Sequence, residues 1–223
     1  MITRPILFSG AMVRALLDGS KTQTRRIVKD LPPWPITEIC HDSGGTGKWM
    51  PNGPAPSGTG MAAGHWRLCP YGQPGDHLWV RETFLDTLGT GVEHRDESGL
   101  RHRYAFAADC APGSYGDQTR KDYGLKWKPS IHMPRAASRI LLEIVSVRVE
   151  RLSEISVSDC HSEGIGQCDG LGNNEEILGL ARRMGTFEQD VLRYATLWES
   201  INGAGSWVDN PWVWVVEFKR VAP

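Results

Sequence analysis

Two long stretches without hydrophobic periodicity constrain the fold of this 223-residue chain more than any other feature. Residues 30–75 are rich in Gly, Pro and Ser, and residues 85–128 mix charged residues with glycines. Neither stretch alternates as a strand or repeats apolar residues at helical spacing, apart from a short strand predicted at 104–106. We therefore predict two long loop-rich insertions, and the core must be built from the ordered segments around them.

The ordered segments are short strands and helices in mixed order. Alternation of apolar and polar residues predicts strands at 5–8, 76–84, 137–151 and 212–221. Helical spacing, Ser and Gly at the ends, and a break near Gly185 predict helices at 9–18, 153–161 and 174–200. This arrangement favours an α+β fold in which helices flank a small β-barrel. The length fits a single domain over residues 1–223 with both insertions inside it.

Composition excludes several functional classes. The formal net charge is −1, so nucleic acid could bind only to a local basic patch. No run of 18 apolar residues is present, and the N-terminus lacks the apolar core of a signal peptide. With five unevenly spaced cysteines, these features predict a cytoplasmic protein with reduced thiols and no membrane partner.

Tryptophan is unusually frequent, with nine in the chain. Large aromatic side chains most often fill the core, and we expect that role for most of them. A sharper alternative is that one or two of them line a pocket for a flat ring.

The run Gly-Ser-Lys-Thr-Gln-Thr-Arg-Arg at 19–26 carries the most chemistry. It follows a predicted helix, and Gly19 suits the position just past a helix end. Lys21 and Thr24 are a candidate base and nucleophile, and two arginines follow them. Taken alone, a lysine here is more simply a solvated cation near the helix dipole.

The spacing Gly19-x-Lys21-x-x-Thr24-x-Arg26 resembles the Gly-x-Lys-x-x-Glu-x-Arg signature of ASCH domains, a branch of the PUA-like superfamily. Residues 75–80, 158–164 and 213–218 are similar to later family segments in the same order. The resemblance covers roughly half of the chain. The stretches 70–76 and 130–135 look like those of larger ASCH proteins from phages and prophages. The resemblance implies a PUA-like barrel.

Thr24 stands where the general signature has Glu, and the same replacement occurs in small bacterial ASCH enzymes that hydrolyse N4-acetylcytidine. The resemblance therefore implies an amidohydrolase that removes the acyl group from N4-acylated cytidine or cytosine. It implies Lys21, Thr24 and Glu163 as the catalytic set and no metal or cofactor. Glu163 is assigned through a short helix, and Glu150 and Glu154 are nearby alternatives.

We expect Arg25, Arg26, Glu82 and Arg135 to contact the substrate. Two mechanisms are open. In one, Thr24 attacks the acyl carbonyl with Lys21 as its base. In the other, Lys21 and a carboxylate activate water, and Thr24 positions the substrate. Free nucleoside, free base and RNA all stay open as substrates, as does the oligomeric state.

The alternative function is an RNA-binding PUA-like module or a ribonuclease. Basic residues near the motif and along the predicted 137–151 strand would form an RNA surface if they gather in the fold, and otherwise they are solvated or paired with acids. The basic residues concerned are Arg14, Arg25, Arg26, Lys29, Arg135, Arg139, Arg148 and Arg151.

A metal site is not expected from the histidines and cysteines of the first insertion. Cys40 is adjacent to His41, and His65 precedes Cys69 by four residues. This spacing matches no common zinc pattern, and adjacent residues are poorly placed to bind one ion together.

Overall fold

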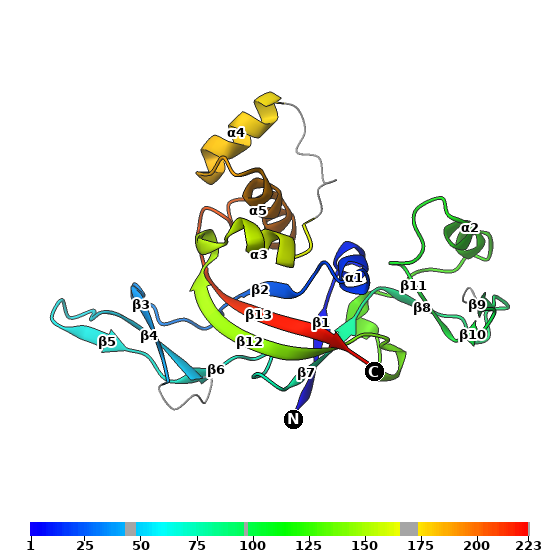
Figure 1. Ribbon diagram of the computed structural model, residues 1–223, viewed down its shortest axis with the longest axis horizontal. Helices are drawn as coiled ribbons and strands as arrows, with labels where there is room; N and C mark the ends of the chain where they lie inside the picture. Colours follow the sequence, from blue (N-terminus) through cyan, green and yellow to red (C-terminus); the bar gives the residue numbers. More distant parts are fainter. Residues whose placement is uncertain (43–47, 96–97, 166–173, 223) are drawn as a thin grey trace. The chain divides into compact units, whose positions relative to one another are not determined.

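The computed structural model describes residues 1–42, 48–95, 98–165 and 174–222, and it is a mixed α+β protein (Figure 1). The chain divides into two compact units. The first unit comprises Met1–Gly19, His77–Glu143 and Arg220–Pro223, and the second comprises Ser20–Asp76 and Ile144–Lys219. Each unit carries one of the two predicted insertions, 85–128 in the first and 30–75 in the second.

The first unit is built on three paired strands. β1 (Thr3–Leu7) pairs in parallel with β7 (His77–Arg81), and β7 pairs antiparallel with the beginning of β12 (Leu141–Arg151). α1 (Gly10–Leu17) follows β1. The Ser9 side chain accepts a hydrogen bond from the Met12 backbone N–H at its start, and Gly19 has a φ of +85° just past its end. The predicted caps of this helix are confirmed.

The insertion of the first unit contains more regular structure than predicted. β8 (Phe84–Asp86) pairs with β11 (Tyr104–Phe106), which confirms the short strand predicted at 104–106. The other pieces were not predicted: β9 (His94–Arg95), β10 (Arg101–His102), α2 (Tyr115–Asp122) and the 3-10 turns η1 (Ser130–His132) and η2 (Arg135–Ala137). Two-residue strands are too short to show alternation, and α2 has a predominantly polar sequence without an apolar stripe. The turn η2 also delays β12, which begins at Leu141 instead of 137.

In the second unit β12 continues beside β13 (Trp212–Val221), and β13 pairs antiparallel with β2 (Gln23–Ile27). Three helices, α3 (Val157–Ser162), α4 (Asn174–Met184) and α5 (Gln189–Asn202), lie to one side of these strands (Figure 1). Buried side chains of β13 and α5, including Val213, Val215, Leu192 and Trp198, form the core between them. The break predicted near Gly185 is confirmed, because α4 ends at Met184 and Gly185 has a φ of +72°.

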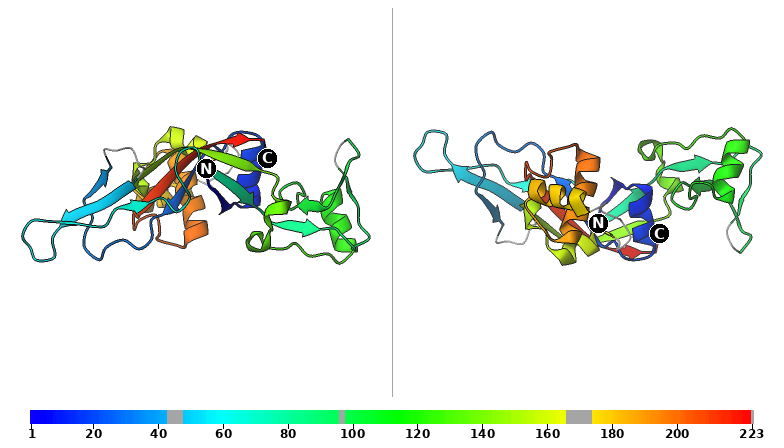
Figure 2. Two further views of the ribbon diagram at one scale, coloured as in Figure 1. Left: turned by 90° about the horizontal axis from the view of Figure 1, so that it is seen from below. Right: turned by 90° about the horizontal axis from the view of Figure 1, so that it is seen from above.

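The prediction that residues 30–75 are loop was wrong for four short segments of this stretch. It contains a sheet of β3 (Glu38–His41), β4 (Lys48–Pro54), β5 (Met61–Ala63) and β6 (Arg67–Leu68), in which β4 pairs with the other three. The cyan β4 and β5 form a long hairpin in both views of Figure 2. Prolines and glycines in β4 hide its alternation. A Cβ at Gly53 would lie 1.9 Å from the Pro35 carbonyl oxygen, so glycine permits the close backbone approach there.

Among the described strands, no pairing closes a sheet into a barrel. The α+β class is therefore observed, whereas the PUA-like barrel stays a prediction. None of the helices in the described ranges has the length and hydropathy needed to cross a membrane.

Candidate functional site

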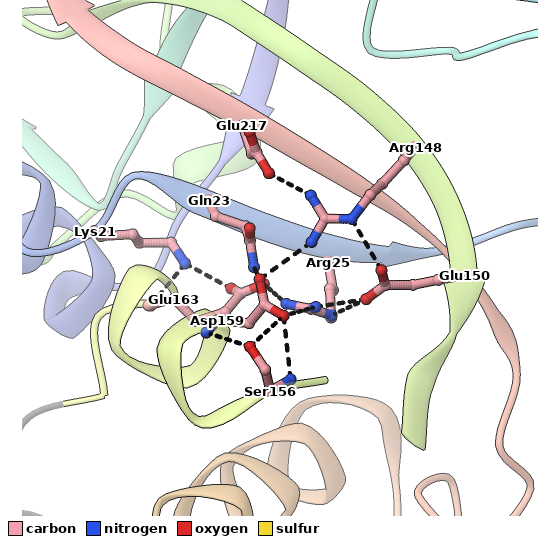
Figure 3. Close-up of polar contacts among 9 residues, drawn as sticks. All are labelled: Lys21, Gln23, Arg25, Arg148, Glu150, Ser156, Asp159, Glu163 and Glu217. Carbon is pink, nitrogen blue, oxygen red and sulfur yellow. Dashed lines mark hydrogen bonds and ion pairs between the residues drawn. The ribbon is translucent and has the colours of Figure 1, made fainter. Parts of the chain in front are cut away.

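The candidate site lies where β2 runs beside α3 in the second unit. Lys21 forms an isolated antiparallel bridge with Glu163, and the Thr22 backbone N–H donates to the Ser162 carbonyl over 2.8 Å. Lys21, Gln23 and Arg25 all direct their side chains toward α3 (Figure 3). Successive side chains of a strand alternate between its two faces, so residues two apart share a face.

Lys21 and Glu163 form a buried ion pair. Lys21 Nζ donates to Glu163 Oε2 and to the Glu163 carbonyl oxygen, both over 2.8 Å, and the two residues are only 2% and 5% exposed. Burial lowers the pKa of Lys21 from its usual value. Attraction to Glu163 raises this pKa, repulsion by Arg26 and Arg25 lowers it, and the net direction is downward. A lysine whose ammonium form is disfavoured is better suited to act as a base than a solvated one.

Arg25 connects Glu163 to two further carboxylates. Its Nη1 lies 3.4 Å from Glu163 Oε1, its Nε donates to Glu150 Oε1 over 3.1 Å, and its Nη2 lies 3.2 Å from Asp159 Oδ2. Arg25 is 3% exposed. Because its donors go to protein carboxylates, the geometry suits a residue that holds Glu163 in place more than one that binds substrate.

Asp159 belongs to the capping box that begins α3. The Asp159 backbone N–H donates to Ser156 Oγ over 3.1 Å, and Asp159 Oδ2 accepts from the Ser156 N–H over 3.1 Å. Asp159 Oδ1 also accepts from Gln23 Nε2 over 3.0 Å. Burial raises the pKa of Asp159, but the hydrogen bonds from Ser156 and Gln23 outweigh burial and hold this pKa below its usual range. The cap therefore ties α3 to β2 and fixes the helix that directly precedes Glu163.

The charged network extends along β12 and β13. Arg148 Nε donates to Glu150 Oε2 over 2.9 Å, and its guanidinium also pairs with Asp159 and Glu217 (Figure 3). In the first unit Arg139 is likewise paired, with Glu82 and Asp109. Arg139 and Arg148 are thus paired with acidic residues, which is the alternative to an RNA-binding surface that the sequence left open.

Thr24 occupies the opposite face of β2. It lies between Gln23 and Arg25 in the strand, so its side chain points away from theirs, and it is 1% exposed. Arg26 is the next residue on the Thr24 face of β2. Burial raises the pKa of Tyr71, and the positive charge of Arg26 acts in the opposite direction. The structure therefore joins Lys21 with Glu163, while strand geometry directs Thr24 to the other side.

Two of the predicted substrate contacts belong to the first unit. Glu82 is 1% exposed and accepts from Arg139 Nε and Nη2 over 2.9 and 3.0 Å, and burial raises its pKa against the opposing effect of Arg139. Arg135 is exposed, with its guanidinium 5.8 Å from the centre of the Trp79 ring. They therefore belong to a different compact unit from Lys21.

Glu163 is the carboxylate that meets Lys21. Of its alternatives, Glu150 binds Arg25, and Glu154 accepts from the Arg151 backbone N–H over 2.7 Å as a cap of the short 3-10 turn η3 (Leu152–Glu154). The helix predicted at 153–161 is consequently divided into η3 and α3.

The cysteine and histidine residues of the 30–75 stretch are the ones that the sequence analysis considered as metal ligands. Cys40 Sγ accepts a hydrogen bond from Asn52 Nδ2 over 3.0 Å, and Cys69 is buried. Within the ranges that the structure describes, no group of three or more His, Cys, Asp or Glu residues is arranged to hold a metal ion.

Gln23 and Asp159 were not predicted as site residues, although the sequence around each contains a recognisable spacing pattern. Ser156-x-x-Asp159 has the spacing of a capping box, and Lys21-x-Gln23-x-Arg25 has the spacing of one strand face. Recognising residues 23–27 as a strand would have placed Gln23 on the same face as Arg25.

No protein-family model matches the chain, and neither a curated protein nor a solved structure matches it. The resemblance to ASCH domains therefore rests on the motif at 19–26 and the three later segments.

Proposed function

We propose that the protein is an amidohydrolase that removes the acyl group from N4-acylated cytidine or cytosine. In this proposal the second unit carries the reactive centre, with Lys21 as the base and Glu163 as its partner. The proposal includes a PUA-like relationship for the fold, which the motif spacing at 19–26 suggests.

The reaction proceeds by attack of water on the acyl carbonyl carbon. Neutral Lys21 accepts a proton from the water as the new C–O bond forms, and the C–N bond to the exocyclic amine then breaks. The proton passes from the Lys21 ammonium to the departing amine, so the products are cytidine and a carboxylic acid. Glu163 accepts a hydrogen bond from the transient ammonium and keeps it in position.

The observation that carries this proposal is the buried contact of 2.8 Å between Lys21 Nζ and Glu163 Oε2. Burial lowers the lysine pKa, and Glu163 limits that fall, so the pair can exchange a proton at a smaller free-energy cost than a solvated lysine. Glu163 is the residue after the end of α3, so the pair sits at a helix end and not in the middle of the apolar core.

The test is hydrolysis of N4-acetylcytidine by purified protein, followed as release of cytidine and acetate. We expect Lys21→Met to lose activity by at least about 10³-fold, within the range attributed to acid–base catalysis. Lys48→Met is the matched control, because Lys48 is an exposed lysine of β4 in the same unit. Its activity should equal that of the unaltered protein.

The pH dependence supplies a second readout. Activity should rise as the pH rises through the lowered pKa of Lys21, and this rise should lie below the pH at which a solvated lysine loses its proton. If the unaltered protein leaves N4-acetylcytidine and longer N4-acyl cytidines intact, the proposal fails. If a folded Lys21→Met protein keeps full activity, the ion pair is structural and Lys21 is not the base.

A further inference from the structure

A cavity of about 270 Å³ lies within the insertion of the first unit, and its wall includes residues of β8, β11 and α2 (Figure 1). Leu85 of β8 and Ala105 of β11 are directly opposed in the strand pair, so they share a face. α2 contributes Gly116 and Thr119, and apart from Tyr115 it has no large apolar side chain. The polar helix therefore leaves a space that its side chains do not fill, whereas protein interiors are normally close-packed.

The wall of this cavity is mainly apolar. Its apolar side chains include those of Leu85, Val92, Ala105, Leu125 and Trp127. Trp127 is half-buried, so its indole ring supplies a flat surface to the wall. A smaller apolar cavity, of about 150 Å³, is enough to hold benzene. The volume here therefore accommodates one six-membered ring with a small polar substituent.

Arg120 gives the wall a hydrogen-bond donor. Its Nη1 donates to the Leu125 carbonyl oxygen over 2.8 Å, and its Nη2 donates to Asp117 Oδ1 over 2.9 Å. Its Nε is buried and has no acceptor among the residues that the structure describes. The wall hydroxyls of Thr87 and Thr119 already donate to backbone carbonyl oxygens. Because a buried N–H without an acceptor is costly, a ligand oxygen that accepts from Arg120 Nε would be stabilised.

The charge around Arg120 favours an anion. Asp117 pairs with Arg120, and its Oδ2 also lies 2.7 Å from Lys121 Nζ. One carboxylate therefore serves two cations, and the three residues together carry one positive charge. Glu93 is the acidic residue in the cavity wall, and it pairs with two arginines of its own. A ligand carboxylate would balance the excess positive charge beside Arg120.

We propose that this cavity binds a small aromatic carboxylate, with one six-membered ring against the apolar wall and the carboxylate accepting from Arg120. Arginine suits this role because its guanidinium stays charged and its planar N–H groups match a carboxylate. A pocket with apolar walls and few polar groups is typical of small-molecule sites. The site lies in the first unit and does not depend on the proposed hydrolysis.

Benzoate is the probe, and its neutral analogue benzyl alcohol tests the need for charge. Calorimetric titration should give a Kd below about 1 mM for benzoate, with benzyl alcohol binding at least about tenfold more weakly. Hexanoate carries the same charge on a flexible chain, which loses conformational freedom on binding, so it should bind at least about threefold more weakly than benzoate.

Arg120→Met should weaken benzoate binding by at least about tenfold and leave benzyl alcohol binding unchanged, because it removes the donor and its charge. The matched control is Lys126→Met, which removes an exposed neighbouring cation outside the wall and should bind benzoate normally. Ala105→Leu places a larger side chain in the cavity and should abolish binding of both ligands. Its urea midpoint should be equal to or higher than that of the unaltered protein, since the added atoms fill a void.

Lys21→Met separates this site from the proposed hydrolysis, because it should bind benzoate normally even where hydrolysis is lost. The proposal is overturned if the unaltered protein binds benzoate no more tightly than benzyl alcohol, or does not bind it at about 5 mM. Hexanoate that binds more tightly than benzoate would also overturn it. So would normal benzoate binding by a folded Ala105→Leu protein, because the ligand would then lie elsewhere. The comparison of ligands on the unaltered protein keeps the test decisive even if Arg120→Met fails to fold.

Discussion

Replacing Glu163 by glutamine tests the buried ion pair through its effect on stability. The change leaves Lys21 Nζ buried without its carboxylate partner, and removing one member of a buried pair typically costs about 3–5 kcal/mol. Lysine can escape this cost by losing its proton. At about pH 7 that loss costs about 5 kcal/mol, since the unfolded pKa lies about 3.4 pH units higher and each unit is worth about 1.4 kcal/mol. At about pH 9.5 it costs only about 1 kcal/mol.

The sign of the pH dependence follows from proton binding. Folding lowers the pKa of Lys21, so the folded protein binds fewer protons than the unfolded chain between the lowered and the ordinary value. Stability therefore rises with pH through that window. Removing Glu163 takes away the contribution that raises this pKa. The pH range in which the folded protein binds fewer protons than the unfolded chain therefore extends to lower pH, and the variant loses most stability near neutral pH.

Urea unfolding at both pH values measures this effect. We expect Glu163→Gln to be about 3–5 kcal/mol less stable than the unaltered protein near pH 7, and about 1–2 kcal/mol less stable near pH 9.5. The control is Glu217→Gln, since Glu217 is a half-exposed carboxylate that pairs with Arg148, and its effect should not change over this pH range. Adding Lys21→Met to Glu163→Gln should abolish the pH dependence. A stability difference that is the same at both pH values would refute the role assigned to the buried ammonium.

Two further predictions concern Thr24 and the helix end before the motif. Thr24→Val keeps the shape of a buried side chain, so it should retain most hydrolysis of N4-acetylcytidine if water is the nucleophile, and a loss of about 10³-fold or more would instead identify Thr24 as the attacking group. Gly19→Ala should destabilise the protein by about 1 kcal/mol in urea, because Gly19 has a φ of +85° that alanine adopts less readily. An added Cβ at Gly19 would meet nothing within 4 Å, so the cost comes from the backbone alone. The control Gly179→Ala, inside α4, should be neutral or stabilising by up to about 1 kcal/mol. Equal effects of the two alanines would contradict the backbone explanation.

Elements with local signals were predictable from the sequence. The ends of α1 follow from Ser9 and Gly19, and the long strands follow from alternation in 141–151 and 212–221. The sheet of β3 to β6 was missed because its strands are short and interrupted by Pro and Gly. Their pairing depends on contacts with segments elsewhere in the chain, which periodicity within one segment does not record.

The candidate site was predictable to a similar degree. Lys21 was assigned from the motif spacing at 19–26 and Glu163 from the resemblance of the later segment 158–164, and the two residues lie within hydrogen-bonding distance. The roles of Arg25 and Asp159 were not foreseen, because a charged residue next to a reactive one looks the same in sequence whether it meets substrate or protein carboxylates. Only the cross-strand and helix contacts identify Arg25 as the residue that connects Glu163 to Glu150 and Asp159.

The alternation of β2 bears directly on the choice between the two mechanisms. A threonine nucleophile needs its base within hydrogen-bonding reach, and a strand separates neighbouring side chains onto opposite faces. Gln23 and Arg25 both reach α3, so Thr24 between them points away from the face where Glu163 holds Lys21. For Thr24 to attack with Lys21 as base, β2 would have to rotate and break the contacts of Arg25 with its carboxylates. Activation of water by Lys21 requires no such rearrangement, and this difference is the reason that the proposal assigns the attack to water.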